Sequence, residues 1–224
     1  MIDPWFAILL VLGLLSISMA LLSAATRKHG MAPEMVRKLL HVEMALVTLS
    51  FPWVFMSAWP VIVLACGAVL WFRLLRTSEW LEKRFGYALR AGGRDSKGEV
   101  WFACGVCLAY LWSAAEPLAY CIAILVLAFA DTAAALVGQR YGQARLLPGG
   151  ARKSAIGSLA FFVTALLVAA AALLIGAGLR PGESLASAAL LAAITTGVEA
   201  SLGDGLDNLF VPIAALVALE FAAL

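Results

Sequence analysis

The sequence has few charged residues. Asp, Glu, Lys and Arg make up only 13% of its 224 residues, whereas 63% are hydrophobic, and the mean hydropathy is +0.96. Soluble domains contain about 25% charged residues, so this composition excludes an ordinary soluble domain. A net charge of +2 is also too small to indicate nucleic-acid binding, and we expect no nucleic-acid partner.

Cysteine and histidine are scarce, with four and two residues respectively. All four cysteines lie within apolar stretches, where cysteine behaves as a small hydrophobic residue. Cys104 and Cys107 form a C-x-x-C pattern, but a zinc or redox site needs accessible thiols or nearby histidines. We therefore interpret the cysteines as packing residues.

Long apolar runs are what the sequence has in abundance. A spanning helix needs about 20 mainly apolar residues, and seven or eight such runs follow one another with short polar connections. Asp3 precedes the first run in place of the basic segment of a cleavable signal, so we expect this run to be retained. We predict a single all-α domain over 1–224, a polytopic transmembrane helical bundle. Its expected spans are about 4–23, 39–55, 58–75, 98–113, 117–138, 155–176, 184–200 and 208–224.

Basic residues gather in alternate connections between the predicted spans. The first, third and fifth connections hold almost all of them, whereas the even-numbered connections contain only Arg180. The positive-inside rule therefore places the odd-numbered connections in the cytoplasm. We expect an integral protein of the cytoplasmic membrane if the source is bacterial, with both termini outside and any active site facing the cytoplasm.

Two carboxylates, Asp131 and Glu199, lie within predicted spans near this cytoplasmic side. A charged side chain inside a membrane is costly, so each is a candidate functional residue or half of a structural pair. Asp131 also begins a stripe of small residues that continues through Ala135 and Gly138 to Gly142. Such a stripe alone indicates helix packing, but with a carboxylate at its start it favours a cavity or a metal site.

The connection 139–154 combines glycines with Arg140, Arg152 and Lys153 and ends where a predicted helix begins. Glycine-rich turns and helix N-termini expose N–H groups that bind phosphate. A P-loop would have glycine directly before the lysine, and Arg152 occupies that position. Considered alone, this connection is better explained by the positive-inside rule.

The segment 203–208 is acidic, on the side where basic connections are expected. Asp204, Asp207 and Asn208 supply three oxygen-bearing side chains, which suit Mg²⁺ bound together with substrate phosphates. The alternative is that Asp207 and Asn208 cap the last helix while Asp204 is solvated.

The second span begins with Arg37, Lys38 and His41. Extension of the two basic side chains towards the membrane surface explains both cations. His41 could be a structural residue, a phosphate contact or a general base, and these alternatives remain open.

Together, these motifs resemble the polyprenol kinase family, which includes dolichol kinase, phytol kinase and the CTP-dependent diacylglycerol kinases. The resemblance extends from the second predicted span to the last. It rests on Arg37-Lys-Leu-Leu-His41, Ala130-Asp131 through Gly142, Lys153-Ser-Ala-Ile-Gly-Ser158, Glu199 and Asp207-Asn208-Leu-Phe-Val-Pro212.

The resemblance implies transfer of a γ-phosphoryl group, usually from CTP, to the hydroxyl of a lipid alcohol with a divalent metal such as Mg²⁺. By position, Asp131 matches the acid of the family's Gly-Asp motif and Lys153 matches its Lys-Ser motif, while Asp207 and Asn208 match its Asp-Asn motif. The chain departs from the family in having Ala130 before the aspartate and in lacking a glutamate shortly after Lys-Ser.

We therefore expect a membrane kinase that acts on phytol, farnesol, geranylgeraniol or a longer polyprenol, with membrane lipids around it. The oligomeric state stays open, as does the identity of the base among Asp131, Glu199 and His41. The expected catalytic residues are Asp131, Lys153, Glu199 and His41; the nucleotide- or phosphate-binding residues are Arg37, Arg140, Gly142, Arg152, Lys153, Ser154 and Asn208; and the metal ligands are Asp131, Asp204 and Asp207.

Two other functions fit parts of the pattern. A CDP-lipid synthase also pairs an aspartate-bearing helix with a Lys-Ser loop, but its closing signature is basic, and Ser201–Asn208 contains no basic residue. An ion-coupled transporter would use Asp131 and Glu199 as relays near the membrane midplane, whereas both are expected towards one face.

Overall fold

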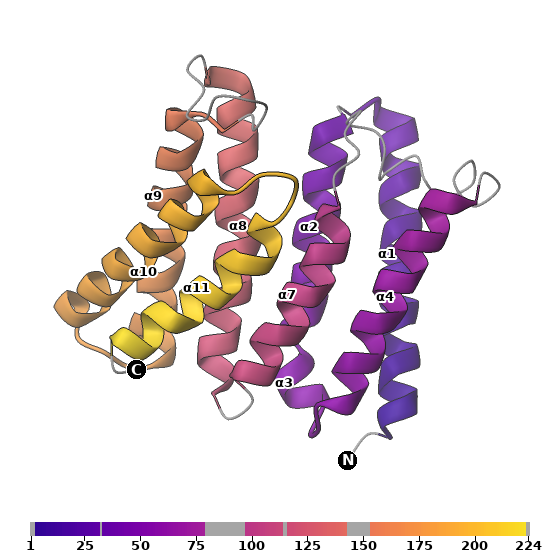
Figure 1. Ribbon diagram of the computed structural model, residues 1–224, viewed down its shortest axis with the longest axis horizontal. Coiled ribbons are helices and arrows are strands. Elements are labelled where there is room, and N and C mark those ends of the chain that lie inside the picture. The colour runs from indigo at the N-terminus through magenta and orange to yellow at the C-terminus, as the bar shows by residue number, and fades with distance from the viewer. Residues whose placement is uncertain (1–2, 32, 79–96, 114–115, 143–152, 223–224) are drawn as a thin grey trace.

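The computed structural model is a bundle of α-helices, and it describes residues 3–31, 33–78, 97–113, 116–142 and 153–222. The predicted all-α bundle is confirmed within these residues (Figure 1). The helices are α1 (Pro4–His29), α2 (Pro33–Thr48), α3 (Phe51–Val54), α4 (Trp59–Thr77), α7 (Gly98–Trp112), α8 (Pro117–Tyr141), α9 (Ala155–Gly176), α10 (Pro181–Ser201) and α11 (Asp207–Phe221).

Four of these helices, α1, α8, α9 and α10, are long and apolar enough to cross a membrane. The helices α4 and α7 contain shorter apolar segments. Large apolar side chains cover the outward faces of α1 and α9, a surface that is stable against lipid and not against water. The chain is therefore an integral membrane protein. Exposed examples are Phe6, Leu9, Ile17, Leu21, Leu159, Leu167 and Ile175.

The prediction of one span over 39–55 is wrong, because two helices occupy this region. The helix α2 begins earlier, at Pro33, and ends at Thr48, and the short α3 follows from Phe51. Pro52 has no backbone N–H, so it cannot donate to the carbonyl of Thr48 four residues earlier. The hydroxyl of Tyr120 donates to that carbonyl instead, at 3.0 Å.

The first helix is longer than predicted and continues to His29 instead of ending near residue 23. No proline or glycine occurs between Leu14 and His29, and Gly30, with a φ of 59°, ends the helix in the left-handed region that glycine favours. The other predicted spans match observed helices to within a few residues.

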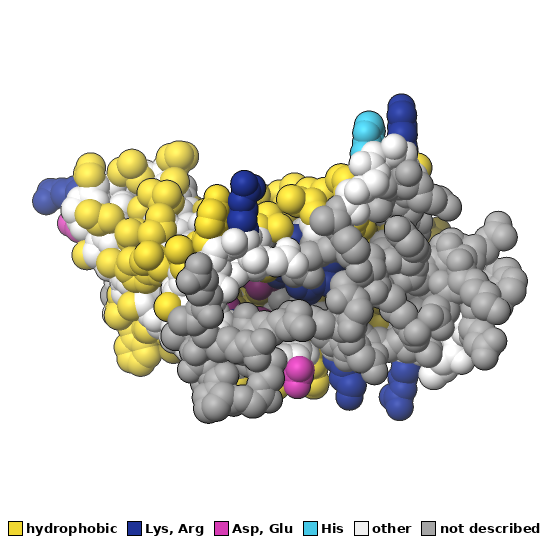
Figure 2. Space-filling model, turned by 90° about the horizontal axis from the view of Figure 1, so that it is seen from above, with side chains coloured by type: hydrophobic (Ala, Val, Ile, Leu, Met, Phe, Trp, Pro, Cys, Tyr) yellow, Lys and Arg dark blue, Asp and Glu magenta, His cyan; other side chains and the backbone are white. Residues whose placement is uncertain are grey.

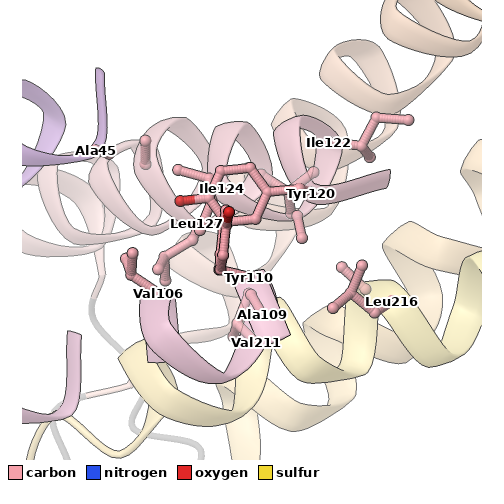
Figure 3. Close-up of a cluster of buried hydrophobic side chains, with 14 of the residues drawn as sticks. Ala45, Val106, Ala109, Tyr110, Tyr120, Ile122, Ile124, Leu127, Val211 and Leu216 are labelled. Atoms are coloured by element: carbon pink, nitrogen blue, oxygen red, sulfur yellow. The ribbon is translucent and has the colours of Figure 1, made fainter. Parts of the chain in front are cut away.

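Buried side chains of α7, α8 and α11 pack together in the core (Figure 3). Tyr110 and Tyr120 pack edge to face with ring centroids 5.9 Å apart, and Tyr110 donates to the carbonyl of Phe55 at 2.6 Å. Tyr120, Ile124 and Leu127 are fully buried. They precede Asp131 on α8 at helical spacing, so the face of α8 below Asp131 is packed with side chains.

Both chain termini lie at the lower end of the bundle in Figure 1. At the upper end, which we call the polar end, lie the N-terminal ends of α2, α7, α9 and α11 and the C-terminal ends of α8 and α10. This arrangement brings together helix ends that are far apart in the sequence. The predicted site residues belong to these helix ends or to the turns between them.

Candidate active site

The interior of the polar end contains a buried ion pair between α2 and α8. Asp131 of α8 is 6% exposed and Lys38 of α2 is 3% exposed. The Nζ of Lys38 donates to the Oδ2 of Asp131 at 2.5 Å. Removing two charges from water is costly, and only a close, well-oriented pair offsets that cost. We call Lys38, Asp131 and His41 the interior cluster.

His41 approaches the same carboxylate from α2. Its Nε2 lies 3.6 Å from the Oδ2 of Asp131, which is beyond hydrogen-bond distance. The ring packs edge-on against Phe102. Among the described residues, the buried Nε2 has no hydrogen-bond partner. A buried polar atom without a partner commonly faces water or a ligand group.

A second group of charges, which we call the rim cluster, joins the start of α9 to α10 and α11. The Nζ of Lys153 donates to the Oε1 of Glu199 at 2.5 Å and to the Oδ2 of Asp207 at 2.7 Å. Ser158, in the first turn of α9, donates to the Oε2 of Glu199 at 3.1 Å. One lysine therefore bridges two carboxylates that come from different helices.

Opposing effects act on the pKa of Lys153. Burial alone would lower it, but the carboxylates of Asp207, Glu199 and Asp131 outweigh burial, so the pKa lies above its ordinary value. Lys153 is thus a cation throughout the neutral range. The influence of Asp131 shows that the interior and rim clusters are close enough for their charges to interact.

The two clusters form one polar region between the helices. Seen from the polar end, acidic and basic side chains are visible in a recess between the two halves of the bundle (Figure 2). Three carboxylates and two ammonium groups meet there, contributed by five segments of the chain. Such a density of buried charge in a membrane protein indicates a functional site.

Glycines hold the start of α9 against the end of α8. Ser154 caps α9 by accepting a hydrogen bond from the N–H of Gly157 at 3.2 Å. A Cβ on Gly142 would lie 2.5 Å from the Oγ of Ser154, and one on Gly138 would lie 2.9 Å from it. The predicted small-residue stripe is therefore a close helix contact, and it positions the N-terminus of α9 with Lys153 just before it.

The acidic segment 203–208 forms a tight turn that packs on the start of α7. The central residues of the turn, Asp204 and Gly205, have φ values of 53° and 83°, as in a type I′ turn. A Cβ on Gly205 would lie 2.4 Å from the Cα of Gly98. Asn208 donates to the carbonyl of Gly98 at 2.9 Å, so its amide ties α11 to α7.

The alternative that Asp207 and Asn208 cap the last helix is wrong. Leu206 is the N-cap of α11, and Asp207 is its first helical residue. The Oδ1 of Asp207 accepts the N–H of Asn208, while its Oδ2 faces Lys153. The carboxylate therefore points into the rim cluster instead of closing a helix end.

The structure brings together five of the residues predicted for the site and leaves others apart. Asp204 is exposed in its turn, and Arg140 is exposed on α8 with its guanidinium over the ring of Tyr141. Arg37 is half-buried on α2. Arg152 lies outside the described residues. The five that come together are His41, Asp131, Lys153, Glu199 and Asp207.

Lys38 is a site residue that the sequence interpretation missed. The sequence interpretation assigned Lys38 to the membrane surface at the start of its helix, whereas α2 begins at Pro33 and Lys38 is buried. In a helix, Lys38 and His41 are spaced i and i+3 and share one face, and this face packs on α8. The i, i+3 spacing of Lys38 and His41 was therefore the sequence signal that could have identified Lys38 as a site residue.

The carboxylates suit a divalent cation only in combination with phosphate oxygens. Within the described residues, no group of three or more His, Cys, Asp or Glu side chains forms a metal site. Mg²⁺, however, is commonly held by one or two carboxylates together with water and substrate phosphates. Asp131 and Asp207 meet this requirement, since both are buried and each lies opposite a flexible lysine side chain.

A comparison with curated proteins finds phytol kinase from Synechocystis sp. (strain ATCC 27184 / PCC 6803 / Kazusa). The two sequences are 33% identical over 192 residues, which cover 83% of this chain and 78% of that protein. No family model matches the sequence. No solved structure matches it either.

Proposed function

The chain belongs to the polyprenol kinase family, and from this premise we propose that it transfers the γ-phosphate of CTP to the hydroxyl of an isoprenoid alcohol. The alcohol would be phytol, farnesol, geranylgeraniol or a longer polyprenol, drawn from the bilayer. The observation that carries the proposal is the joint burial of three carboxylates and two ammonium groups at one end of a membrane bundle. Phosphoryl transfer depends mainly on positioning and charge neutralisation, which is what such a site supplies.

The donor phosphates would bind at the start of α9. Lys153 precedes this helix, and the N-terminal N–H groups and dipole of a helix favour an anion. Arg152, adjacent in sequence, together with Arg140 and Arg37 would add positive charge around the nucleotide. Gly142, Ser154 and Asn208 would act by position, because they hold α9 against α8 and α11 against α7.

Asp131 and Asp207 are the ligands that we propose for Mg²⁺ or another divalent cation, with the exposed Asp204 as a third candidate. A bound cation would neutralise the negative charge of the transferring phosphoryl group. Asp131 sits in the interior cluster and Asp207 in the rim cluster. A cation shared by the two carboxylates would therefore lie between the clusters.

His41 is the candidate for accepting the proton of the alcohol. Asp131 and Glu199 each accept an ammonium hydrogen bond at 2.5 Å, so both carboxylates already hold a donor. The Nε2 of His41 has no such partner among the described residues. A hydroxyl that donated to this nitrogen would also be close to Asp131, where the phosphoryl group is expected.

The active site would face the cytoplasm, where nucleotides are present. The helix ends that flank the basic connections lie at the polar end, and the positive-inside rule places such connections in the cytoplasm. Both termini lie at the opposite end and would be outside. The alcohol would then present its hydroxyl at the cytoplasmic interface while its chain stayed in the bilayer.

The test is phosphate transfer by the purified protein in lipid nanodiscs with Mg²⁺ and γ-³²P-labelled CTP, with labelled ATP in parallel. The acceptors are phytol, farnesol, geranylgeraniol, longer polyprenols and diacylglycerol. Label in an isoprenoid alcohol, abolished by Asp131→Asn, is the expected result. Pyrophosphate release with phosphatidate would identify a CDP-lipid synthase, and ion-coupled uptake without transfer would identify a transporter.

A further inference from the structure

Among the described residues, Lys38 uses only part of its hydrogen-bonding capacity. An ammonium group carries three N–H donors, and the described residues give its Nζ one acceptor, the Oδ2 of Asp131. At 3% exposure the group is also shielded from water. Burying an ammonium group costs several kcal/mol unless its donors are used. The remaining donors can therefore bind an acceptor that a ligand supplies.

The net charge of the two clusters indicates that a cation and the phosphates bind together. Lys38 and Lys153 oppose three carboxylates, which gives 2 − 3 = −1. These five charges therefore do not by themselves attract a polyphosphate while the lysines remain paired with acids. A divalent cation on the carboxylates changes the balance to −1 + 2 = +1 and leaves the ammonium groups without their acidic partners. Phosphate oxygens are then the natural acceptors.

We propose that Lys38 is a ligand of the donor's phosphates, held by Asp131 until a nucleotide enters and then passed to a phosphate oxygen. This inference rests on the proposed kinase function and assigns it a phosphate-binding residue deep in the bundle. The exchange is non-covalent, because one hydrogen bond of the ammonium group replaces another. Asp131 is left facing the cation that accompanies the nucleotide.

The position of Lys38 specifies which phosphate it would contact. Its Nζ and the Nε2 of His41 both lie within 3.6 Å of the same Asp131 oxygen. A hydroxyl bonded to His41 would bring the phosphoryl group that it attacks beside Lys38. Lys153, in the rim cluster, is further out, with an 18% exposed side chain. Lys38 would therefore bind the transferring phosphoryl group and Lys153 the rest of the phosphate chain.

The test measures nucleotide binding without turnover. CTP is titrated by calorimetry into the detergent-purified protein with Mg²⁺ and without any alcohol. We expect Lys38→Met to weaken the Kd about 10-fold or more, as for loss of a charge-assisted hydrogen bond. Lys38→Arg should keep the Kd within about threefold. The control is Lys28→Met, an exposed residue near the end of α1, which should leave the Kd unchanged.

A second pair of variants covers the case in which Lys38→Met does not fold. Asp131→Asn releases Lys38 from its acid, so this variant should bind CTP in EDTA at least as tightly as the natural protein does. The double variant, Asp131→Asn with Lys38→Met, lacks both charges of the buried pair, so no unpaired charge opposes folding. It should also lack the gain in CTP affinity. Equal binding by Asp131→Asn and the double variant would overturn the proposal.

The outcomes separate this inference from the function on which it rests. If the natural protein binds neither CTP nor ATP and labels no alcohol, the kinase proposal fails and the role of Lys38 fails with it. If it binds CTP and phosphorylates an alcohol while Lys38→Met binds CTP equally well, only the role of Lys38 is refuted. In that case Lys38 is a structural partner of Asp131.

Discussion

The interior and rim clusters use lysines in different ways. In the interior cluster one lysine faces one carboxylate between two helices, and its side chain is 4% exposed. In the rim cluster one lysine bridges two carboxylates at helix ends, and its side chain is 18% exposed. The comparison teaches that the lysines of a site for a charged substrate can form ion pairs with carboxylates of the same site. In the proposed function, depth would separate the reacting group from the rest of the substrate.

The largest effect is expected from Asp131→Asn, which breaks the interior cluster. It removes a proposed metal ligand and leaves Lys38 buried without its acid, so we expect phosphate transfer to fall about 1,000-fold or more. The measurement is transfer of labelled phosphate to the best acceptor at saturating CTP. Retention of more than a tenth of the activity would exclude Asp131 from the reacting centre.

Lys153→Met breaks the rim cluster and should have the next largest effect. Two buried carboxylates would face each other without a cation, which costs about 3–5 kcal/mol of stability, a fall in Tm of roughly 6–20 °C. Transfer should fall about 100-fold. The raised pKa of Lys153 means that its stabilising charge is present at neutral pH and is lost only as pH rises through that pKa.

Lys153→Arg provides the matched control for this change, because it keeps the charge but alters the geometry of the bridge. We expect most of the stability and part of the activity to return. Thermal unfolding in detergent and the transfer assay measure the two separately. A Lys153→Met protein with the Tm of the natural protein would contradict the bridge.

Gly142→Ala tests the contact that supports the rim cluster without changing a charge. The new Cβ would overlap the Oγ of Ser154 and shift the start of α9, so we expect about a tenfold loss of transfer with a lower Tm. Gly67→Ala, on α4, adds a Cβ that would meet no other atom within 4 Å, so it should retain activity and gain slightly in helix stability. The two variants are compared by their rates of phosphate transfer, and equal rates would contradict a role for the Gly142 contact.

Ser158→Ala should have the smallest effect, because it removes one hydrogen bond from the Oε2 of Glu199 and leaves Lys153 in place. Loss of one such bond costs about 1 kcal/mol, which corresponds to roughly a fivefold change. We expect that change in the KM for CTP, with kcat nearly constant. A 100-fold fall in phosphate transfer by Ser158→Ala would mean that activity depends more on the position of Glu199 than on that of Asp131.

The sequence predicts the bundle well because apolar runs of spanning length are local signals. Asp131, Lys153, Glu199 and Asp207 could be named because charge inside or beside such runs is rare. The pairings could not be predicted, since Lys38 meets Asp131 and Asn208 meets the carbonyl of Gly98 across long stretches of sequence. The break before α3 was missed because the apolar run 39–55 continues through Pro52, and the break depends on the N–H that this proline lacks.

The packed face of α8 below Asp131 has a consequence for how catalysis should be measured. Leu127, Ile124 and Tyr120 fill the interior directly beneath the site, so the tail of a long alcohol has no course through the bundle along this face. In the proposed function, the tail would stay among lipid tails, and the protein would contact only the head of its acceptor. The relevant KM is then a mole fraction in the bilayer, and diluting the acceptor with inert lipid should slow the reaction at constant bulk concentration.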